Sequence, residues 1–406
     1  MRRVVVTGMG CITALGQDWA QTKLRLQQGR NAIRYMPEWE RYEGLFTKLA
    51  GPVDFDKPAH YSRKTTRTMG RVALLAVRAT ELALEAAGLQ DDPLLASGRV
   101  GIAYGSSTGS TSAIADFSNM LLKGSTQGLN ATSYIRMMSH TTAVNIAVFF
   151  GVKGRVYTTS SACTSSSQGI GYGYEAIRHG SQNIMLCGGA EELCPTEAAV
   201  FDTLFATSTK NDTPELTPRP FDKDRDGLVI GEGACTLVLE ELEHAQARGA
   251  TIYAEIIGYG TNCDGAHVTQ PCVDSVSKVL QLSLDDAGIS ASDVDYISAH
   301  GTATDRGDIA ESHAVLKVLG DKTPVSALKS YTGHTLGACG ATEAWATIMM
   351  MQDGWFHPTL NLRSVDPNCA AIDYITGDGR RLACDIAMSN NFAFGGINTS
   401  LIFKRA

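Results

Sequence analysis

The amino-acid sequence predicts an α/β fold built from two related halves. Helix-like and strand-like segments alternate along the 406 residues. Two stretches repeat the same order of elements about two hundred residues later in the chain. The spacing between the repeats is unequal, so chance similarity among α/β segments stays open as an alternative. We expect the two halves to span residues 1–250 and 251–406.

The first repeated stretch consists of a helix and a strand. VALLAVRATELALEAAGL (72–89) has apolar residues at helical spacing and stops at Gly88. GRVGIAYGSS (98–107) is typical of a buried strand that enters a glycine turn. KVLQLSLDDAGI (278–289) and VDYISAHGTAT (294–304) repeat that order. At the N-terminus, MRRVVVTGMGCITALG predicts a strand followed by a turn.

The second repeated stretch contains the most reactive side chains. RVYTTSSACTSSSQGIGYGYEAI (155–177) and PVSALKSYTGHTLGACGATEAWATI (324–348) both predict a strand, small polar residues, glycines and a helix. If the duplication holds, Cys163 and His334 lie in related turns of related halves.

The composition excludes several classes of protein. The net charge of -7 and the pI near 5.7 provide no general attraction to nucleic acid or to an anionic membrane. No apolar run is long enough for a membrane span, and the N-terminal run is too short for a signal peptide. The ten cysteines form no C-x-x-C pair, which is typical of reduced cytosolic thiols. We expect a cytoplasmic protein without nucleic-acid or membrane partners.

Two stretches come close to known ligand-binding motifs. VTGMGCITALG lacks the third glycine of a dinucleotide-binding fingerprint, because Thr13 stands in its place. DKDRDGLVIGEGA, from Asp222, resembles a calcium-binding loop, but its twelfth position is Gly233 instead of glutamate. The sequence therefore predicts neither nicotinamide nor calcium binding.

Cys163 lies in a setting that suits a nucleophile. The glycines and serines around it let a substrate approach the sulfur, and a helix that begins just after it favours the thiolate. A buried structural cysteine is the alternative, and the usual one. His300 in SAHGTATDRGD and His334 in LKSYTGHTLGACG each follow a strand-like segment, so we expect both to meet Cys163 at one sheet edge. Lys329 lies five residues before His334 and can share its site.

Six stretches together carry a resemblance to a known family. They are SSACTSSSQGIG, FDTLFATSTKNDTPE, RPFDKDRDGLVIGEGA, AHGTATDRGD, LKSYTGHTLGACG and SNNFAFGGINTS. In this order they resemble the beta-ketoacyl-(acyl carrier protein) synthases, the condensing enzymes of fatty-acid synthesis. The match runs end to end, and GGAEELC with STKNDTPE is closer to the type I branch.

The resemblance implies a fold and a reaction. The expected fold is thiolase-like: two duplicated halves in a five-layered α-β-α-β-α sandwich, normally as a homodimer. The expected reaction joins an acyl group to malonyl-ACP by decarboxylative Claisen condensation, without metal, flavin or nicotinamide. The partner is an acyl carrier protein (ACP) loaded with acyl or malonyl groups.

The resemblance also implies roles for the residues around Cys163, which matches the acyl-accepting nucleophile. His300 and His334 match the two histidines that stabilise the enolate. The backbone N–H groups of Cys163 and Phe394 match the oxyanion hole. Lys329 matches an assisting lysine, and Glu311 the glutamate expected to pair with it.

Further positions match substrate and ion contacts of the family. Thr302 and Thr304 match hydroxyls that bind the pantetheine arm, and Phe392 matches another substrate contact. Thr108 matches the floor of the acyl tunnel, a position where relatives have glycine or a bulkier aliphatic residue. The walls of the acyl tunnel are matched by Phe201, Met137 and Met138. The ligands of a monovalent cation are matched by Glu343, Ser389 and Asn390. Ser298 and Ala299 depart from the pattern that accompanies that cation, so we predict no metal.

A basic cluster matches the surface that docks the acidic carrier. SRKTTRTMGR places Arg63, Lys64, Arg67 and Arg71 close together, although a solvated charged face is the alternative.

Other functions stay open. The main prediction is fatty-acid elongation, and a specialised ketosynthase for aryl polyenes or polyketides is the second, either as a homodimer or with a chain-length-factor-like partner. A CoA-dependent thiolase would need a second cysteine near the C-terminus, in a pattern that GHTLGACG and SNNFAFGG do not supply. Cys163 argues against a non-catalytic chain-length factor.

Overall fold

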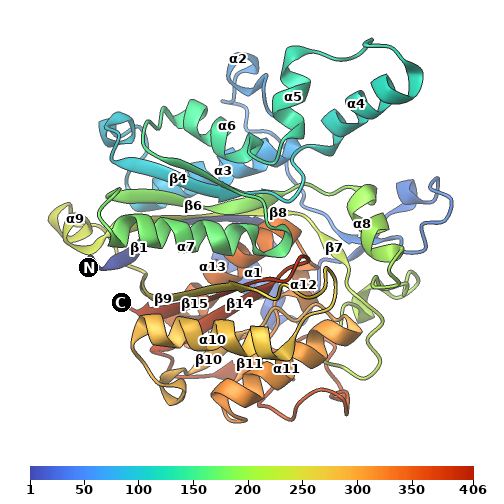
Figure 1. The fold of residues 1–406 in the computed structure, drawn as a ribbon, viewed down its shortest axis with the longest axis vertical. Coiled ribbons are helices and arrows are strands. Elements are labelled where there is room, and N and C mark those ends of the chain that lie inside the picture. Colours follow the sequence, from blue (N-terminus) through green and yellow to red (C-terminus); the bar gives the residue numbers. More distant parts are fainter.

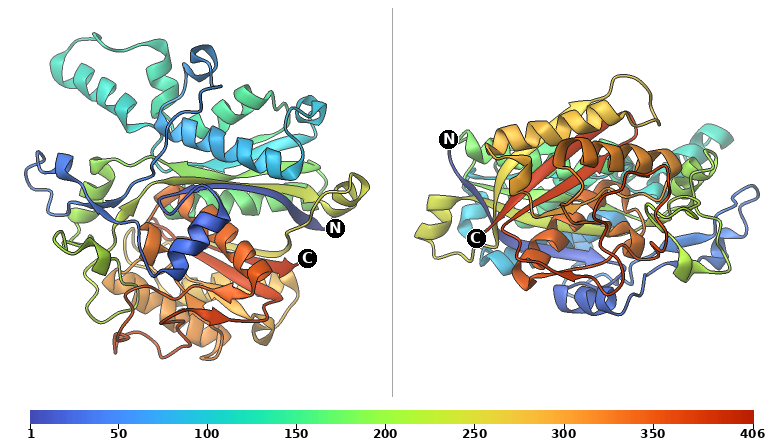
Figure 2. Two further views of the ribbon diagram at one scale, coloured as in Figure 1. Left: turned by 180° about the vertical axis from the view of Figure 1, so that it is seen from behind. Right: turned by 90° about the horizontal axis from the view of Figure 1, so that it is seen from below.

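The computed structural model describes all 406 residues, which fold into five layers (Figure 1). Outer helices cover the two faces of the molecule, two β-layers lie inside them, and further helices lie in the centre. The views from behind and from below show the same stacking, with the two chain ends close together at one edge (Figure 2). The predicted five-layered, thiolase-like α/β architecture is confirmed.

The β-layers belong to one continuous sheet, which shows the duplication directly. The first half contributes β1 (Val4–Thr13), β4 (Val100–Gly105), β5 (Val156–Thr159), β6 (Ile184–Glu191) and β8 (Gly233–Glu241). The second half contributes β9 (Ala254–Cys263), β10 (Tyr296–Ser298), β11 (Val325–Ser326), β14 (Ile386–Phe392) and β15 (Ile397–Arg405). The order is β11-β10-β14-β15-β9-β1-β8-β6-β4-β5, so each half has the same strand order outward from the centre.

The pattern of parallel and antiparallel pairs is also the same in both halves. In the first half β1, β8 and β6 pair antiparallel, whereas β6, β4 and β5 pair parallel. The second half repeats this with β9, β15, β14, β10 and β11. The halves join where β1 pairs with β9 over three residue pairs at one end. The connection before β9 contains residue 250, and a domain boundary at that position stays a prediction.

The helices follow the same duplication. On the outside, α3 (Arg71–Ala87) and α10 (Val273–Ala287) each pack on the first strand of their half, and α11 (Asp305–Leu319) packs beside α10. In the centre lie α7 (Ser165–Arg178) and α13 (Cys339–Asp353). The remaining helices are α1 (Trp19–Gln27), α2 (Arg63–Thr66), α4 (Thr111–Lys123), α5 (Ala131–Met137), α6 (Thr141–Phe150), α8 (Pro195–Asp202), α9 (Leu242–Ala247) and α12 (Lys329–Thr332). None of the helices is long and apolar enough to cross a bilayer.

Short strands complete the structure outside the main sheet. One small sheet consists of β2 (Arg34–Tyr35), β3 (Leu49–Gly51) and β7 (Ile230–Gly231), and another of β12 (Trp355–Phe356) and β13 (Arg380–Arg381).

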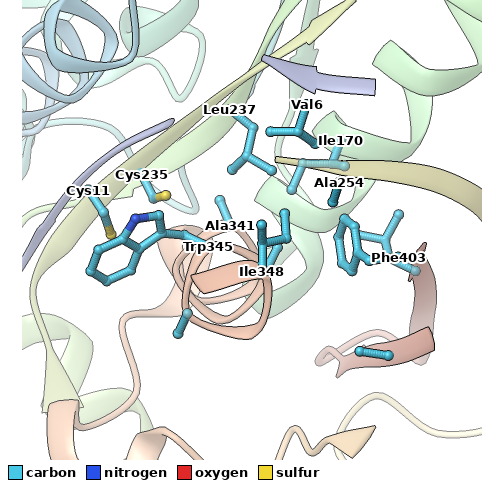
Figure 3. Close-up of a cluster of buried hydrophobic side chains, with 14 of the residues drawn as sticks. Val6, Cys11, Ile170, Cys235, Leu237, Ala254, Ala341, Trp345, Ile348 and Phe403 are labelled. Carbon is cyan, nitrogen blue, oxygen red and sulfur yellow. The ribbon is translucent and has the colours of Figure 1, made fainter. Parts of the chain in front are cut away.

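The largest hydrophobic cluster fills the central layer. Figure 3 shows Ala341, Trp345 and Ile348 of α13 among side chains of both halves, including Leu237 of β8 and Phe403 of β15. All five side chains are buried. The cluster therefore holds the two halves together around α13, the helix that follows the His334 turn.

Glycines let each outer helix lie close against its first strand. A Cβ at Gly8 or Gly10 of β1 would come within 2.4 or 2.2 Å of carbonyl oxygens of α3. Gly258 and Gly260 of β9 have the same relation to α10, at 2.4 and 2.5 Å. The glycines that resemble a dinucleotide fingerprint therefore serve strand–helix packing. They lie within β1, which continues through them to Thr13 before the chain turns.

We expect Gly10→Ala to destabilise the protein strongly, because its Cβ would overlap the Ala79 carbonyl oxygen at 2.2 Å. The free energy of unfolding in urea should fall by about 3 kcal/mol, at the upper end of the range for overpacked cores. Gly88→Ala is the matched control at the end of α3, where no atom lies within 4 Å and only the φ of +67° is strained. Its cost should be near 1 kcal/mol. An equal loss in both variants would contradict the packing role.

Candidate active site

Two related turns face each other in the interior. A short 3₁₀ turn, Ala162–Thr164, carries Cys163 between β5 and α7, and another, Leu336–Ala338, lies between α12 and α13. Both begin with a non-glycine residue in left-handed backbone, Ala162 at φ +50° and Leu336 at φ +43°. Such backbone is costly for these residues and is found where a structure requires it. The turn of Cys163 and the turn just after His334 are therefore equivalent parts of the duplicated fold.

Cys163, His300 and His334 come together in one buried site. His334 Nε2 lies 3.0 Å from Cys163 Sγ, and the two imidazole rings have centroids 5.2 Å apart. The Cys163 sulfur and one ring nitrogen of each histidine all lie within 4.8 Å of one another. All three side chains are at most 5% exposed. The geometry places two imidazoles at the sulfur, as the sequence predicts.

Hydrogen bonds define which ring nitrogen of each histidine carries the proton. His334 Nδ1 accepts the Leu336 backbone N–H at 3.1 Å, and His300 Nδ1 accepts from Lys329 Nζ at 3.0 Å. Burial lowers the pKa of both histidines well below the usual value, and the nearby Lys329 charge lowers each further. Both imidazoles are therefore neutral, and each carries its hydrogen on Nε2, as a donor.

Lys329 is buried, and its ammonium group has three acceptors. Besides His300 Nδ1, it donates to the His300 carbonyl oxygen at 2.7 Å and to the Glu343 carboxylate. The expected pairing with Glu311 is wrong. Glu311 instead accepts the backbone N–H groups of His300 and Gly301, both at 2.7 Å, so its side chain holds the His300 turn in place. Burial raises the pKa of Glu311 to about 8.

Glu343 and Asn391 belong to the hydrogen-bond network around Lys329, a role that sequence reasoning missed. Glu343 binds Lys329 with one oxygen and accepts from Asn391 Nδ2 at 2.7 Å with the other. The available signal was a lone carboxylate in the otherwise uncharged run CGATEAWATIMM. The role matched for Glu343 was that of a cation ligand, together with Ser389 and Asn390. Ser389 Oγ and both amide atoms of Asn390 are buried without a hydrogen-bond partner.

The resting state of Cys163 differs from the expected thiolate. Burial raises the pKa of the thiol to about 11, although Lys329 and the backbone N–H groups of Phe394 and Cys163 act in the opposite direction. Desolvation of the sulfur therefore outweighs the favourable helix N-terminus. The thiol is neutral at pH 7. The same two backbone N–H groups lie near the sulfur, where the oxyanion hole is expected.

A cavity of about 480 Å³ opens onto this site. Predicted residues that line it are Cys163, Phe201, His300, Thr302, Thr304, Glu311, His334, Phe392 and Phe394. The hydroxyls of Thr302 and Thr304 lie 2.8 Å apart, consistent with the prediction that they project to the same side. Predicted residues that do not line it are Thr108, Met137, Met138 and Lys329.

The predicted docking residues lie on the surface. Arg63, Lys64 and Arg67 are in and just after α2, and all three side chains are exposed without an ion pair. Arg71 has a structural role instead, because its guanidinium binds the buried Glu232 carboxylate at 2.5 Å. The exposed basic group therefore consists of three residues.

Comparisons with known proteins identify the family of this chain. Residues 1–245 match the family model described as beta-ketoacyl synthase, N-terminal domain, and residues 253–363 match the corresponding C-terminal domain. The 3-oxoacyl-(acyl-carrier-protein) synthase 1 of Haemophilus influenzae is 36% identical, covering 100% of this chain and 99% of that protein. The synthase 2 of Synechocystis is 37% identical, covering 100% and 98%.

Solved structures show the same relationship. A beta-ketoacyl synthase from Burkholderia phymatum has a TM-score of 0.99 at 58% identity, covering all of both chains. The ishigamide ketosynthase/chain length factor has a TM-score of 0.91 at 35% identity, covering 100% of this chain and 99% of that one. Because both domain models match in order and the relatives align over their full length, the chain belongs to the beta-ketoacyl synthase family.

Proposed function

We propose that this chain is a 3-oxoacyl-ACP synthase in which Cys163 carries the acyl group. In the first half-reaction the Cys163 sulfur attacks the acyl-ACP thioester, the bond to the pantetheine sulfur breaks, and the thiol proton passes to that leaving thiolate. In the second, malonyl-ACP loses carbon dioxide, and the resulting carbanion attacks the acyl-Cys163 carbonyl. The products are 3-oxoacyl-ACP, carbon dioxide and the Cys163 thiolate, which takes up one proton from water to restore the thiol. The observation that carries the proposal is the pair of Nε2–H donors beside the sulfur.

Charge develops on oxygen in both steps, and the site has donors for it. The bond to carbon dioxide leaves its electron pair on the malonyl thioester, as an enolate whose oxygen can accept from the Nε2–H groups of His300 and His334. The tetrahedral oxyanion on the acyl group would accept from the backbone N–H groups of Cys163 and Phe394. Donors that are already oriented in a buried site stabilise such charge without reorganisation.

Exposed residues indicate where a carrier protein would dock and how two copies of the chain would pair. The exposed, unpaired Arg63, Lys64 and Arg67 would bind an acidic carrier, and one related ketosynthase structure contains its acyl-carrier protein. The edge strand β5 has exposed residues, including Val156 at 41%, and would pair with a second copy in a homodimer. A mixed pair is the alternative, because another related ketosynthase is bound to a chain length factor.

Fatty-acid elongation in the cytoplasm is the pathway we propose first. A specialised ketosynthase is the second candidate, because Thr108 donates a hydrogen bond to the buried Glu197 at a position where a hydrocarbon tunnel would have apolar groups.

Cys163→Ala should abolish acyl transfer, because no nucleophile remains. Acyl-ACP mixed with each protein and analysed by intact-mass spectrometry should add one acyl group to the wild type and none to the variant. Release of labelled carbon dioxide from malonyl-ACP should persist in the variant, which also shows that it is folded. An acyl adduct on the variant at another residue would refute the assignment.

His300→Ala and His334→Ala should each lower malonyl-ACP decarboxylation by about 100-fold, because one enolate donor is lost. The rate of carbon dioxide release measures this. His300→Asn and His334→Gln, which keep an N–H donor, should retain more activity than the alanine variants. Equal rates for the alanine variants and the wild type would exclude the two imidazoles as enolate donors.

Alkylation of Cys163 by iodoacetamide should rise continuously with pH. Only the thiolate reacts, so with a pKa of about 11 its rate should rise about 100-fold from pH 7 to pH 9. Lys329→Met should slow alkylation at any one pH, because the Lys329 charge lowers the thiol pKa. Peptide mapping separates Cys163 from the exposed Cys263. A rate that is already constant at neutral pH would show a resting thiolate.

A further inference from the structure

Helix α8 leads from the cavity at Cys163 to a second polar site. Phe201 lines the cavity and stacks on Phe394, with ring centroids 4.9 Å apart. Glu197 lies four residues earlier on α8, so it is on the same face of the helix, about 6 Å along its axis. Both side chains are buried. Glu197 therefore lies one helical turn beyond the aromatic wall of the cavity.

The carboxyl group of Glu197 is only partly satisfied. Its side chain is 4% exposed, and Oε1 accepts from the Thr108 hydroxyl at 3.1 Å. Oε2 is buried with no hydrogen-bond partner, and no lysine, arginine or histidine forms an ion pair with the group. A buried polar atom without a partner is costly and uncommon in a native structure. Oε2 therefore calls for a polar group that this chain alone does not supply.

The neighbouring acid Glu191 forms no hydrogen bond with Glu197. Glu191 accepts instead from Ser106, Ser107 and Gly337. Burial, followed by the charge of Glu191, raises the pKa of Glu197 well above the usual value. A raised pKa favours the protonated form of the carboxyl group, which offers one O–H donor.

Glu197 is followed on α8 by residues of an apolar cluster. Ala198 and Phe201 belong to a buried cluster with Leu336, and Phe394 packs against that cluster. Leu336 begins the turn that follows His334, so the cluster adjoins the catalytic site. An acyl chain on Cys163 has to occupy apolar space, and this cluster is the apolar wall that the cavity shares with α8.

We propose, on the basis of the condensing activity proposed above, that the acyl-binding site extends past Phe201, beyond the residues that line the cavity at Cys163, and ends at Glu197 and Thr108, which bind the hydroxyl of a hydroxyl-bearing acyl group. The Glu197 O–H would donate to the substrate oxygen, and the substrate O–H would donate to Thr108 Oγ1. A methyl end group would leave Glu197 Oε2 without a partner. A site built to bind a hydroxyl rejects an analogue that lacks it, because the buried polar groups of the site are left unpaired. The hydroxyl can be phenolic or aliphatic, since both offer one donor and one acceptor.

The test is a competition between matched acyl carriers. One pair is omega-hydroxyoctanoyl-ACP and octanoyl-ACP, and the other is para-hydroxycinnamoyl-ACP and cinnamoyl-ACP. Equal amounts of each pair are mixed with the protein, and the acyl group on Cys163 is identified by mass spectrometry. We expect the hydroxylated member to be preferred about tenfold or more in at least one pair. The pair that shows the preference distinguishes an aliphatic from a phenolic substrate.

Variants assign the preference to Glu197. Glu197→Leu should remove the preference and increase loading of the unsubstituted carrier, whereas Glu197→Gln, which keeps a donor and an acceptor, should retain part of it. Thr196→Val, at an exposed position beside Glu197, is the matched control and should keep the wild-type preference. The iodoacetamide reactivity of Cys163 shows that each variant keeps an intact catalytic site.

Each outcome decides between the proposals. Equal loading of both members in both pairs by the wild-type protein, or a preference that survives Glu197→Leu, would overturn the assignment of Glu197 while leaving the condensing function in place. Absence of any acyl group on Cys163 with all four carriers would overturn the proposed function itself, and the assignment of Glu197 with it.

Discussion

The chemistry of the site depends on the buried ammonium group of Lys329. A buried lysine charge is tolerated only when its three hydrogens have acceptors, and here they are His300 Nδ1, the His300 carbonyl oxygen and Glu343. Because Nδ1 of His300 accepts, the imidazole must carry its hydrogen on Nε2. The lysine therefore orients a donor although it does not itself line the cavity. It also keeps His300 neutral, since a second positive charge 3.0 Å away would be strongly unfavourable.

Two buried glutamate side chains connect the site to both halves of the fold. Glu191, at the end of β6, accepts the Gly337 backbone N–H at 2.9 Å, which ties the turn after His334 to the first half. Glu311, on α11, fixes the His300 turn through two backbone N–H groups. The distances between the three reactive groups therefore depend on the duplicated framework as well as on local side-chain packing.

The sequence was most informative where local chemistry decides structure. Helices that end at Gly88 and Gly288 follow from apolar spacing and a left-handed glycine, and both ends are where the pattern predicts them. The meeting of Cys163 with His334 followed from their place after equivalent strands. The partner of Lys329 could not be derived in this way, because Glu311 and Glu343 are both buried near it. Glu311 accepts the backbone N–H groups of the His300 turn, and Glu343 is the one that binds Lys329. The hydrogen bond between Thr108 and Glu197 is likewise a contact over 89 positions of sequence that no local pattern contains.

The charge of Cys163 was predicted wrongly because sequence does not reveal how strongly a nucleophile is desolvated. A helix N-terminus and a nearby ammonium favour the thiolate, and both are readable from sequence, but the desolvation that opposes them depends on packing from both halves. A thiol that stays neutral until acyl-ACP arrives is also protected from oxidation and alkylation, which proceed through the thiolate. The leaving pantetheine sulfur can accept the proton as the new thioester forms, so a standing negative charge is not required. The enzyme would then develop negative charge only in its transition states, at the positions where four N–H donors are already in place, and this favours the transition states over the resting state.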